Sequence, residues 1–148
     1  MLSPAGTIGS GTYGVAKSVN LVGVKVLSNA GTGLNSAVIA GVEWVLEQAL
    51  KEKDRPKICN LSLTGGFLSP ALNKYVSALV TEGLVFTAVA AGNDNRTACL
   101  SSPANAFGVM SVGATDRNDQ RSSFSNFGRC VDIFGELSFS PTCFHLLK

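Results

Sequence analysis

Alternating blocks of apolar and polar residues predict strands and helices in turn along the chain. Short apolar runs, each bounded by polar or glycine residues, have the length and boundaries of buried strands. These runs are Leu21–Leu27, Ile58–Leu63, Leu84–Ala91, Val109–Ala114 and Val131–Phe134. None of the runs alternates strictly between apolar and polar residues, so we expect strands that are buried on both faces.

Two segments between these runs change to the period of an amphipathic helix. From Asn35 to Lys51 apolar residues recur at the spacing of one helix face, with Asn35 or Ser36 as the expected N-cap. That stripe consists of Val38, Val42, Val45 and Ala49. A Ser-Pro pair opens the second helix, Pro70 to Glu82, whose apolar stripe consists of Leu72, Val76 and Leu79.

The order strand, helix, strand, helix, strand predicts an α/β fold. With right-handed crossovers it gives a three-layer, doubly wound parallel sheet with helices on both faces. Ligands of such folds bind outside the carboxyl ends of the strands. We therefore expect the functional loops to begin at Ser28, Leu63 and Ala91.

Composition narrows the class of protein. A chain of 148 residues with 45% apolar and 15% charged residues predicts one packed globular domain. The net charge is only +2, and the charged run at residues 51–57 alternates in sign, which argues against nucleic-acid binding. No apolar stretch reaches the roughly 18–20 residues of a membrane span. We expect a protein that binds neither nucleic acid nor membrane.

The segment Gly9–Gly14 matches the dinucleotide-binding pattern GxGxxG in letters only. That motif requires a strand before it and a helix N-terminus after it, where free backbone N–H groups meet the pyrophosphate. No strand is predicted before Gly9, and the next predicted element is a strand. We therefore expect no nucleotide and no organic cofactor.

The cysteines do not form a metal site. Cys59, Cys99, Cys130 and Cys143 include no C-x-x-C pair and have no ligand-like spacing to the single histidine, His145. Cys59 lies in an apolar run, and we expect a buried free thiol. Cys99 and Cys130 lie in polar, loop-like surroundings, where the spacing permits a disulfide without requiring one.

Two groups of residues have both an ordinary and a functional interpretation. Gly92-Asn93 after a strand is typical of a turn, but Asn93 could instead point an N–H into the ligand crevice as a donor to developing negative charge. Residues 61–66 and Ser28–Leu34 are either plain turns or the two walls of a groove that binds an extended peptide.

Asp132 is a carboxylate within the apolar run Val131–Phe134, where an unpaired charge is costly. A calcium ion held by Asp132 and loop carbonyls would satisfy it, because hard cations prefer oxygen ligands. A helix N-terminus or Arg121 would satisfy it equally well.

Taken together and in order, these motifs resemble the subtilase family of serine proteases, in its proteinase K-like branch. The resemblance covers about residues 5–135. The segments that carry it are Ala5–Ser10, Tyr13–Ala16, Val24–Leu27, Gly31–Gly33, Ser62–Gly66, Ala90–Asn93, Ser102–Ala104, Val112–Ala114, Ser122–Gly128 and Val131–Gly135. The order and number of these segments make the match specific.

The resemblance implies a role for several residues. It assigns Asn93 as the oxyanion donor, a peptide or protein as the substrate, and a disulfide between Cys99 and Cys130. The walls of the peptide groove would be Gly31, Thr32 and Gly33 on one side and Ser62, Leu63, Thr64 and Gly65 on the other, although the family usually has glycine in place of Thr64. A structural calcium would be bound by Asp132 and the carbonyls of Phe107 and Val109. We expect a monomer.

The resemblance ends abruptly on both sides. The family's catalytic histidine motif would fall just before Met1, and its aspartate further upstream. Residues 136–148 contain no Gly-Thr-Ser-Met-Ala nucleophile motif. We therefore expect residues 1–135 to be an incomplete catalytic domain with a divergent tail at 136–148, inactive alone because Ser, His and Asp are missing. A non-catalytic peptide-binding protein is the alternative. No signal peptide is visible at Met1–Gly6, although the family is usually secreted, so the compartment is open.

Overall fold

The computed structural model describes residues 4–65 and 67–136, and the chain divides into two compact units. The smaller unit contains helix α1 (Pro4–Gly9) and the segment that follows it up to Val24. Its backbone turns back on itself, because Gly14 N donates to Ser10 O at 2.9 Å and Ala16 N to Ile8 O at 2.8 Å. The sequence patterns did not predict α1.

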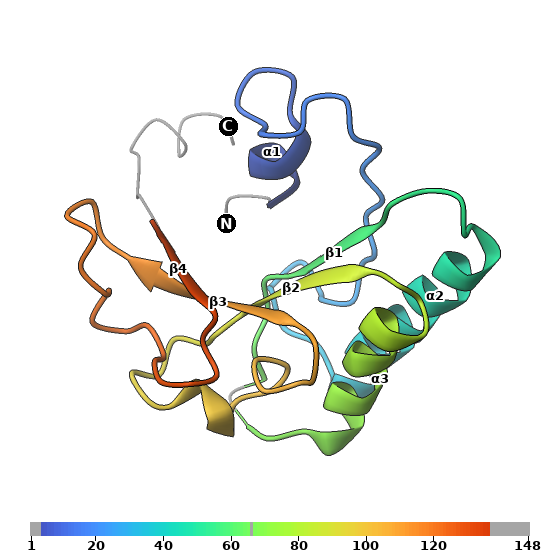
Figure 1. Ribbon diagram of the computed structural model, residues 1–148. Coiled ribbons are helices and arrows are strands. Elements are labelled where there is room, and N and C mark those ends of the chain that lie inside the picture. The colour runs from blue at the N-terminus through green and yellow to red at the C-terminus, as the bar shows by residue number, and fades with distance from the viewer. Residues whose placement is uncertain (1–3, 66, 137–148) are drawn as a thin grey trace. The chain divides into compact units, whose positions relative to one another are not determined.

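The larger unit is built on a parallel sheet of four strands in the order β1-β2-β3-β4 (Figure 1). The strands are β1 (Ile58–Leu61), β2 (Phe86–Ala90), β3 (Met110–Thr115) and β4 (Ile133–Glu136). All three neighbouring pairs are parallel. The α/β fold with a parallel sheet, predicted from the order of the elements, is confirmed.

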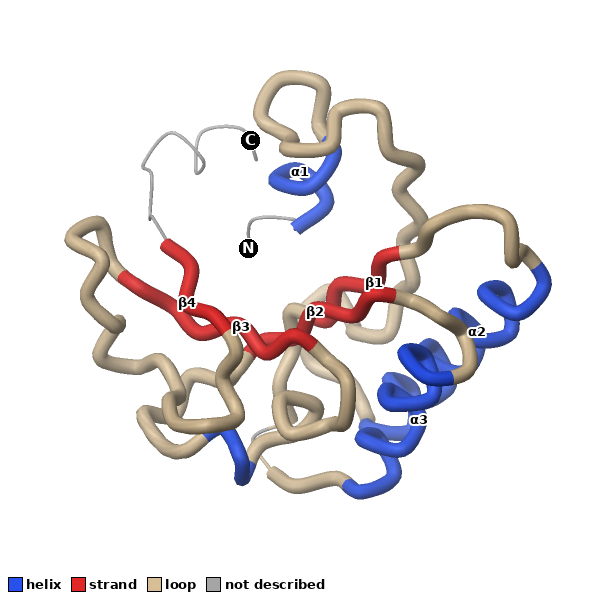
Figure 2. Tube along the Cα trace, viewed as in Figure 1, coloured by secondary structure: helices blue, strands red, loops and turns tan. Residues whose placement is uncertain are grey.

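Helices α2 (Asn35–Lys51) and α3 (Pro70–Thr81) pack against each other beside one face of this sheet (Figure 2). Their buried stripes, together with the inward side chains of β1 and β2, form the main core. It consists of Val38, Val42, Ala49, Leu61, Leu72, Val76, Leu79, Val85, Val89 and Ala106. The two helix periods read from the sequence therefore identified the faces that are buried.

The two helices begin in different ways. Ser69 caps α3, because its Oγ accepts a hydrogen bond from Leu72 N at 3.3 Å and Pro70 occupies the first helical turn. The expected cap of α2, Asn35 or Ser36, is wrong. Leu34 is the N-cap there and forms no side-chain capping bond, so α2 depends on its packed face for stability.

The strand expected at Leu21–Leu27 is absent from the structure. These residues straddle the division between the two units, and their first members are exposed, with Val22 at 72%. A strand needs a neighbour to complete its hydrogen-bond ladder, and β1 pairs only with β2 among the described strands. Val26 nevertheless packs against the main core, which explains the apolar pattern.

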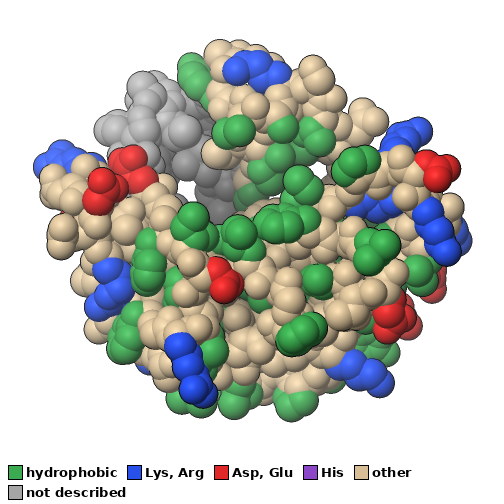
Figure 3. Space-filling model, viewed as in Figure 1, with side chains coloured by type: hydrophobic (Ala, Val, Ile, Leu, Met, Phe, Trp, Pro, Cys, Tyr) green, Lys and Arg blue, Asp and Glu red, His purple; other side chains and the backbone are tan. Residues whose placement is uncertain are grey.

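The second face of the sheet carries apolar side chains that no element of residues 25–136 covers. Ile58, Phe86 and Ile133 are 76%, 51% and 51% exposed. Their registers place them on the same face, opposite the one that α2 and α3 cover. In the view of Figure 3, hydrophobic side chains lie across the surface and Lys and Arg side chains are scattered without forming one patch.

Cys59 is a free, half-buried thiol on β1. Burial raises its pKa above the ordinary value because the thiolate loses hydration. Within the described part of the chain, no helix combines the length and apolar character needed to cross a membrane.

Truncating a core leucine tests this packing. We expect Leu79→Ala to lower the free energy of unfolding by about 2–5 kcal/mol, because Leu79 of α3 is fully buried in the main core. Leu50→Ala on the exposed side of α2 is the matched control and should cost much less. Urea denaturation measures both changes, and equal losses would contradict the assigned core.

Candidate functional site

The loops that follow β1 and β2 leave the sheet at the same end, where the parallel strands have their carboxyl ends. β1 ends at Leu61 and β2 at Ala90, and the two strands are parallel neighbours in register. Their carboxyl ends therefore deliver residues 62–65 and 91–96 side by side, as a parallel sheet requires. The sequence predicted functional loops at both of these places, and a third beginning at Ser28.

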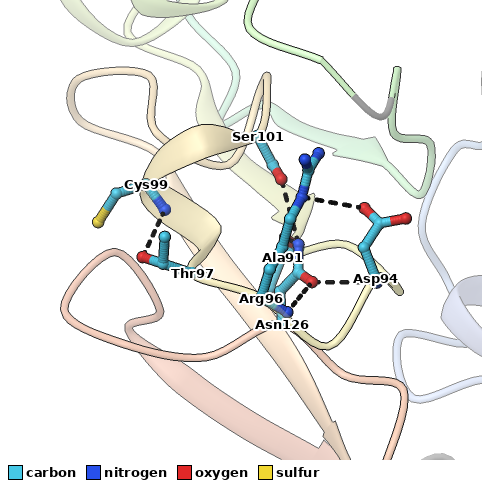
Figure 4. Close-up of polar contacts among 7 residues, drawn as sticks. All are labelled: Ala91, Asp94, Arg96, Thr97, Cys99, Ser101 and Asn126. Atoms are coloured by element: carbon cyan, nitrogen blue, oxygen red, sulfur yellow. Dashed lines mark hydrogen bonds and ion pairs between the residues drawn. The ribbon is translucent and has the colours of Figure 1, made fainter.

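The loop at residues 91–96 is held by one buried side chain, Asn126 (Figure 4). Asn126 is completely buried. Its Nδ2 donates to Ala91 O at 2.9 Å and to Ser101 Oγ at 3.1 Å. Its Oδ1 accepts from Asp94 N at 3.0 Å and from Arg96 N at 3.1 Å. Both donors and both acceptor positions of the carboxamide are therefore occupied, three by this loop and one by Ser101.

Backbone bonds continue the same attachment. Asn126 N donates to Gly92 O at 2.9 Å and Asn95 N to Phe124 O at 2.8 Å. Phe127 N donates to Arg96 O at 3.0 Å. The segment around Asn126 thus runs beside the loop and contacts it at nearly every residue.

The segment around Asn126 is itself fixed to the sheet. Ser125 is buried, and its Oγ accepts from Ala114 N of β3 at 2.9 Å. Arg121 Nη1 donates to Ser125 O, and the Arg121 guanidinium lies 5.1 Å from the centre of the Phe127 ring. β3 therefore supports Asn126, and Asn126 supports the loop after β2.

Gly92 is required by this arrangement for two reasons. Its φ is +108°, a conformation that side-chain-bearing residues rarely adopt. A Cβ at this position would also overlap Nδ2 of Asn126 and lie 3.1 Å from its Cγ. The glycine thus permits the close approach of the Asn126 amide.

Asn93 stands apart from its neighbours in this loop. It is exposed, and it forms no hydrogen bond with any residue of the described ranges, whereas Ala91, Gly92, Asp94, Asn95 and Arg96 are all tied. Arg96 and Asp94 form an exposed ion pair with Nε to Oδ2 at 3.5 Å. The Asn93 carboxamide is therefore available to donate an N–H to an oxygen outside the protein.

A disulfide links the chain that follows the loop at residues 91–96 to the chain that follows Asn126. Cys99 and Cys130 are joined, with their Cα atoms 5.2 Å apart. Cys99 lies in the short helix η1 (Ala98–Leu100), where Thr97 Oγ1 accepts from Cys99 N at 3.4 Å. The bridge connects the chain after the Asn93 loop to the chain before β4.

The two segments predicted as groove walls both lie near the start of α2. Gly65 N donates to Ser102 O at 3.4 Å, and a Cβ built on Gly65 would lie 3.6 Å from Asn35 Oδ1, at the start of α2. Thr32 precedes α2 in a turn in which Ser28 N donates to Thr32 O at 2.8 Å. Residues 31–33 and 62–65 therefore approach the same end of α2, and the groove between them stays a prediction.

Individual members of these walls differ in exposure. Ser62 is exposed and its Oγ accepts from Asn60 Nδ2 at 2.9 Å. Leu63 is half-buried and packs against the main core, and Thr64 is half-buried too. Gly31 has a φ of +77°, as a tight turn requires. The side chain of Leu63 therefore anchors the segment.

Asp132 pairs with neither Arg121 nor the N-terminus of a described helix. Its carboxylate is exposed, and Oδ2 accepts from Ser111 N at 2.7 Å while Asp132 N donates to Ser111 O at 2.9 Å. The expected charge burial and the partners named for it, Arg121 or a helix N-terminus, are wrong. Phe107 is 75% exposed and Val109 packs against the core. No cluster of three His, Cys, Asp or Glu side chains occurs among the described residues.

Three residues of this site were missed by sequence reasoning: Asn126, Ser125 and Ser101. All three are buried polar side chains that form hydrogen bonds with residues distant in sequence: Ser125 and Asn126 bond to backbone, and Ser101 accepts from the Asn126 side chain. A hydrogen bond between residues 35 positions apart produces no periodic pattern. The polar run at residues 122–128, which contains two of them, was the only local signal.

Comparison with known proteins gives a consistent result. A model of the subtilase family matches residues 3–141. The chain is 52% identical over 131 residues to alkaline serine protease ver112 of Corniculantispora psalliotae and 53% identical over 132 residues to the cuticle-degrading protease of Metarhizium anisopliae. Each match covers 88% of this chain but only 34% and 33% of the relative, so the chain spans about a third of the length of these curated relatives.

A solved structure, that of a cold adapted subtilisin-like serine proteinase, superposes with a TM-score of 0.82 at 48% identity. The match covers 89% of this chain and 46% of that chain. The fold of the larger part of the chain is therefore one already known from a protease.

Substitution of Gly92 tests the described loop. We expect Gly92→Ala to destabilise the protein by about 1–3 kcal/mol, because the new Cβ is strained at positive φ and displaces the Asn126 amide. Gly135→Ala is the matched control, since its Cβ would meet only Val112 Cγ1 at 4.0 Å. Urea unfolding compares the two, and a neutral Gly92→Ala would contradict the structure of this loop.

Proposed function

The chain belongs to the subtilase family of serine proteases, and from this premise we propose that it is the central part of a serine endopeptidase domain. It supplies the peptide-binding segments 31–33 and 62–65 and the oxyanion donor Asn93. We place the partial catalytic domain at residues 1–135 and a divergent tail at 136–148, although the family match continues to residue 141 and Glu136 still belongs to β4. Proteins and peptides are the proposed substrates.

The observation that carries the proposal is the position of Asn93. It follows β2 at the carboxyl edge of a parallel sheet, it is exposed, and the residues on both sides of it are fixed. A fixed donor stabilises the negatively charged oxygen of a tetrahedral intermediate more than the neutral carbonyl, because no reorganisation is needed when the charge forms. Resemblance to the family assigns the same role to this residue.

One donor does not replace the nucleophile. Peptide hydrolysis in this family needs a serine that attacks the carbonyl, a histidine that takes its proton and an aspartate that orients the histidine. The 148 residues contain one histidine, His145, which lies outside the described residues. We therefore propose that these residues alone do not hydrolyse peptides and that the family's activity requires the catalytic triad.

A second candidate is a non-catalytic peptide-binding protein. It is favoured by the approach of both proposed wall segments to the start of α2. An extended peptide placed there would bond to the backbone of residues 62–65 as an added strand. This function needs the groove and no triad.

Labelling with a fluorophosphonate probe separates the candidates from an active enzyme. The probe reacts with an activated serine, so we expect no covalent adduct by mass spectrometry on the purified 148-residue chain. A complete subtilase serves as the positive control. Labelling of the chain at one serine, with cleavage of a peptide that weakens on Asn93→Leu, would overturn the proposed inactivity.

We also propose a calcium ion held by Asp132 with the carbonyls of Phe107 and Val109. Oxygen ligands suit calcium, and Asp132 lies beside the start of β3 because it pairs with Ser111. A single carboxylate predicts weak affinity, in the range of about 10⁻⁴–10⁻³ M. The ion would tie β4 to the chain before β3 and would take no part in the chemistry.

Thermal unfolding tests the calcium proposal. We expect about 10 mM calcium to raise the midpoint of the wild type by a few degrees and that of Asp132→Asn by none, because the asparagine keeps the acceptor for Ser111 N but loses the charge. Asp116→Asn is the matched control. Asp116 is also a carboxylate that accepts backbone bonds, and those bonds from Asn118 and Gln120 lower its pKa. An equal response in all three proteins would contradict the site.

A further inference from the structure

We infer that Asn126 is the positioning residue of the oxyanion donor: its buried carboxamide fixes the loop on both sides of Asn93 and so aims the Asn93 side chain. The inference rests on the proposed role of Asn93 and adds a second residue to that site. Asn126 does not touch the substrate. It acts through the backbone of Ala91, Gly92, Asp94 and Arg96.

The first support is the distribution of the bonds. Nδ2 and the backbone N of Asn126 bind the carbonyls of Ala91 and Gly92, before Asn93, at 2.9 Å each. Oδ1 binds the amides of Asp94 and Arg96, after Asn93, at 3.0 and 3.1 Å. One side chain thus holds both flanks of a single residue. Within residues 91–96, Asn93 alone forms no hydrogen bond with any described residue.

The second support is burial. Asn126 is 0% exposed, and a buried carboxamide with unpaired atoms is costly, so the loop cannot move away without leaving donors and acceptors unsatisfied. Gly92 permits this burial, because the Asn126 amide fills the space where a Cβ would stand.

The third support is the chemistry of the amide. Asparagine presents two donors and an acceptor with two lone pairs, and this site uses all four. Aspartate would lose both donors, and leucine would lose all four bonds. The demand for both functions on one short side chain explains an asparagine at this position.

Aiming matters because a donor stabilises an oxyanion only when its N–H is already in place. A mobile Asn93 would have to be ordered at each binding event, which reduces affinity. Loss of Asn126 should therefore reduce the interaction with a negatively charged oxygen more than the binding of the rest of the peptide.

The experiment uses the 148-residue chain and two forms of one peptide, ending in a free carboxylate or in an amide. The carboxylate is the group that hydrolysis of a peptide bond produces, and its oxygen stands for the oxyanion. Isothermal titration gives the ratio of the two affinities, with Asn93→Leu as the baseline. We expect the ratio of carboxylate to amide affinity to be about tenfold higher for the wild type than for Asn93→Leu. The reason is that hydrogen bonds to charged groups are stronger than those to neutral groups.

In Asn126→Ala the ratio should fall to the Asn93→Leu baseline, while the affinity for the amide peptide changes little. Asn105→Ala is the matched control. Asn105 is also a bridging carboxamide, bonded to Cys99 O and Asn73 Nδ2, but its side chain forms no hydrogen bond with residues 91–96. Its loss should leave the ratio at the wild-type value, although the chain is less stable.

Each outcome decides a different claim. A wild type without preference for the carboxylate refutes the proposed role of Asn93, and the inference falls with it. A wild-type preference that persists in folded Asn126→Ala overturns the inference alone. If Asn126→Ala does not fold, Ser101→Ala removes one of the two acceptors of Nδ2 and decides the matter: a reduced ratio supports positioning, and an unchanged ratio overturns it.

Discussion

The geometry of the site depends on one buried carboxamide. Asn126, in the chain between β3 and β4, is buried beside the loop after β2, and each polar atom of its side chain is paired. Leaving such a group unpaired in the interior costs about 1–3 kcal/mol per donor or acceptor. Several neighbouring features follow from this requirement. Gly92 has no side chain because the amide occupies that space, and Ser125 holds the backbone of Asn126 to β3.

The fold supplies the rest of the site by simple geometry. Parallel strands end at one edge, so β1 and β2 bring residues 62–65 and the Asn93 loop together. Helices α2 and α3 pack against one face of β1 and β2. This scaffold therefore supports the two functions proposed for it: binding of an extended peptide and donation of a hydrogen bond from Asn93 to a charged oxygen. An activated hydroxyl and its base, which bond cleavage needs, are not part of the described site.

The sequence predicted the elements whose signal is local and periodic. The bounds of α2 and the start of α3 at Pro70 were correct because a helix stripe and a Ser-Pro start lie within a few residues. The strand at 21–27 was wrong because an apolar run does not reveal whether a neighbouring strand exists. Asp132 was misjudged because its neighbours in sequence are apolar although its carboxylate is exposed. Asn126 was missed because a long-range polar network leaves no periodic trace.

The central claim, that Asn126 fixes the loop around Asn93, is tested most directly by amide hydrogen exchange on the unmodified chain. The backbone amides of Asp94 and Arg96 lie in a loop, yet they donate to a buried oxygen, so they should exchange as slowly as the amides of β2. The amides of Asn118 and Gln120 give the reference, because they donate to the exposed carboxylate of Asp116 and should exchange faster. Exchange at Asp94 and Arg96 as fast as at Asn118 would contradict the account.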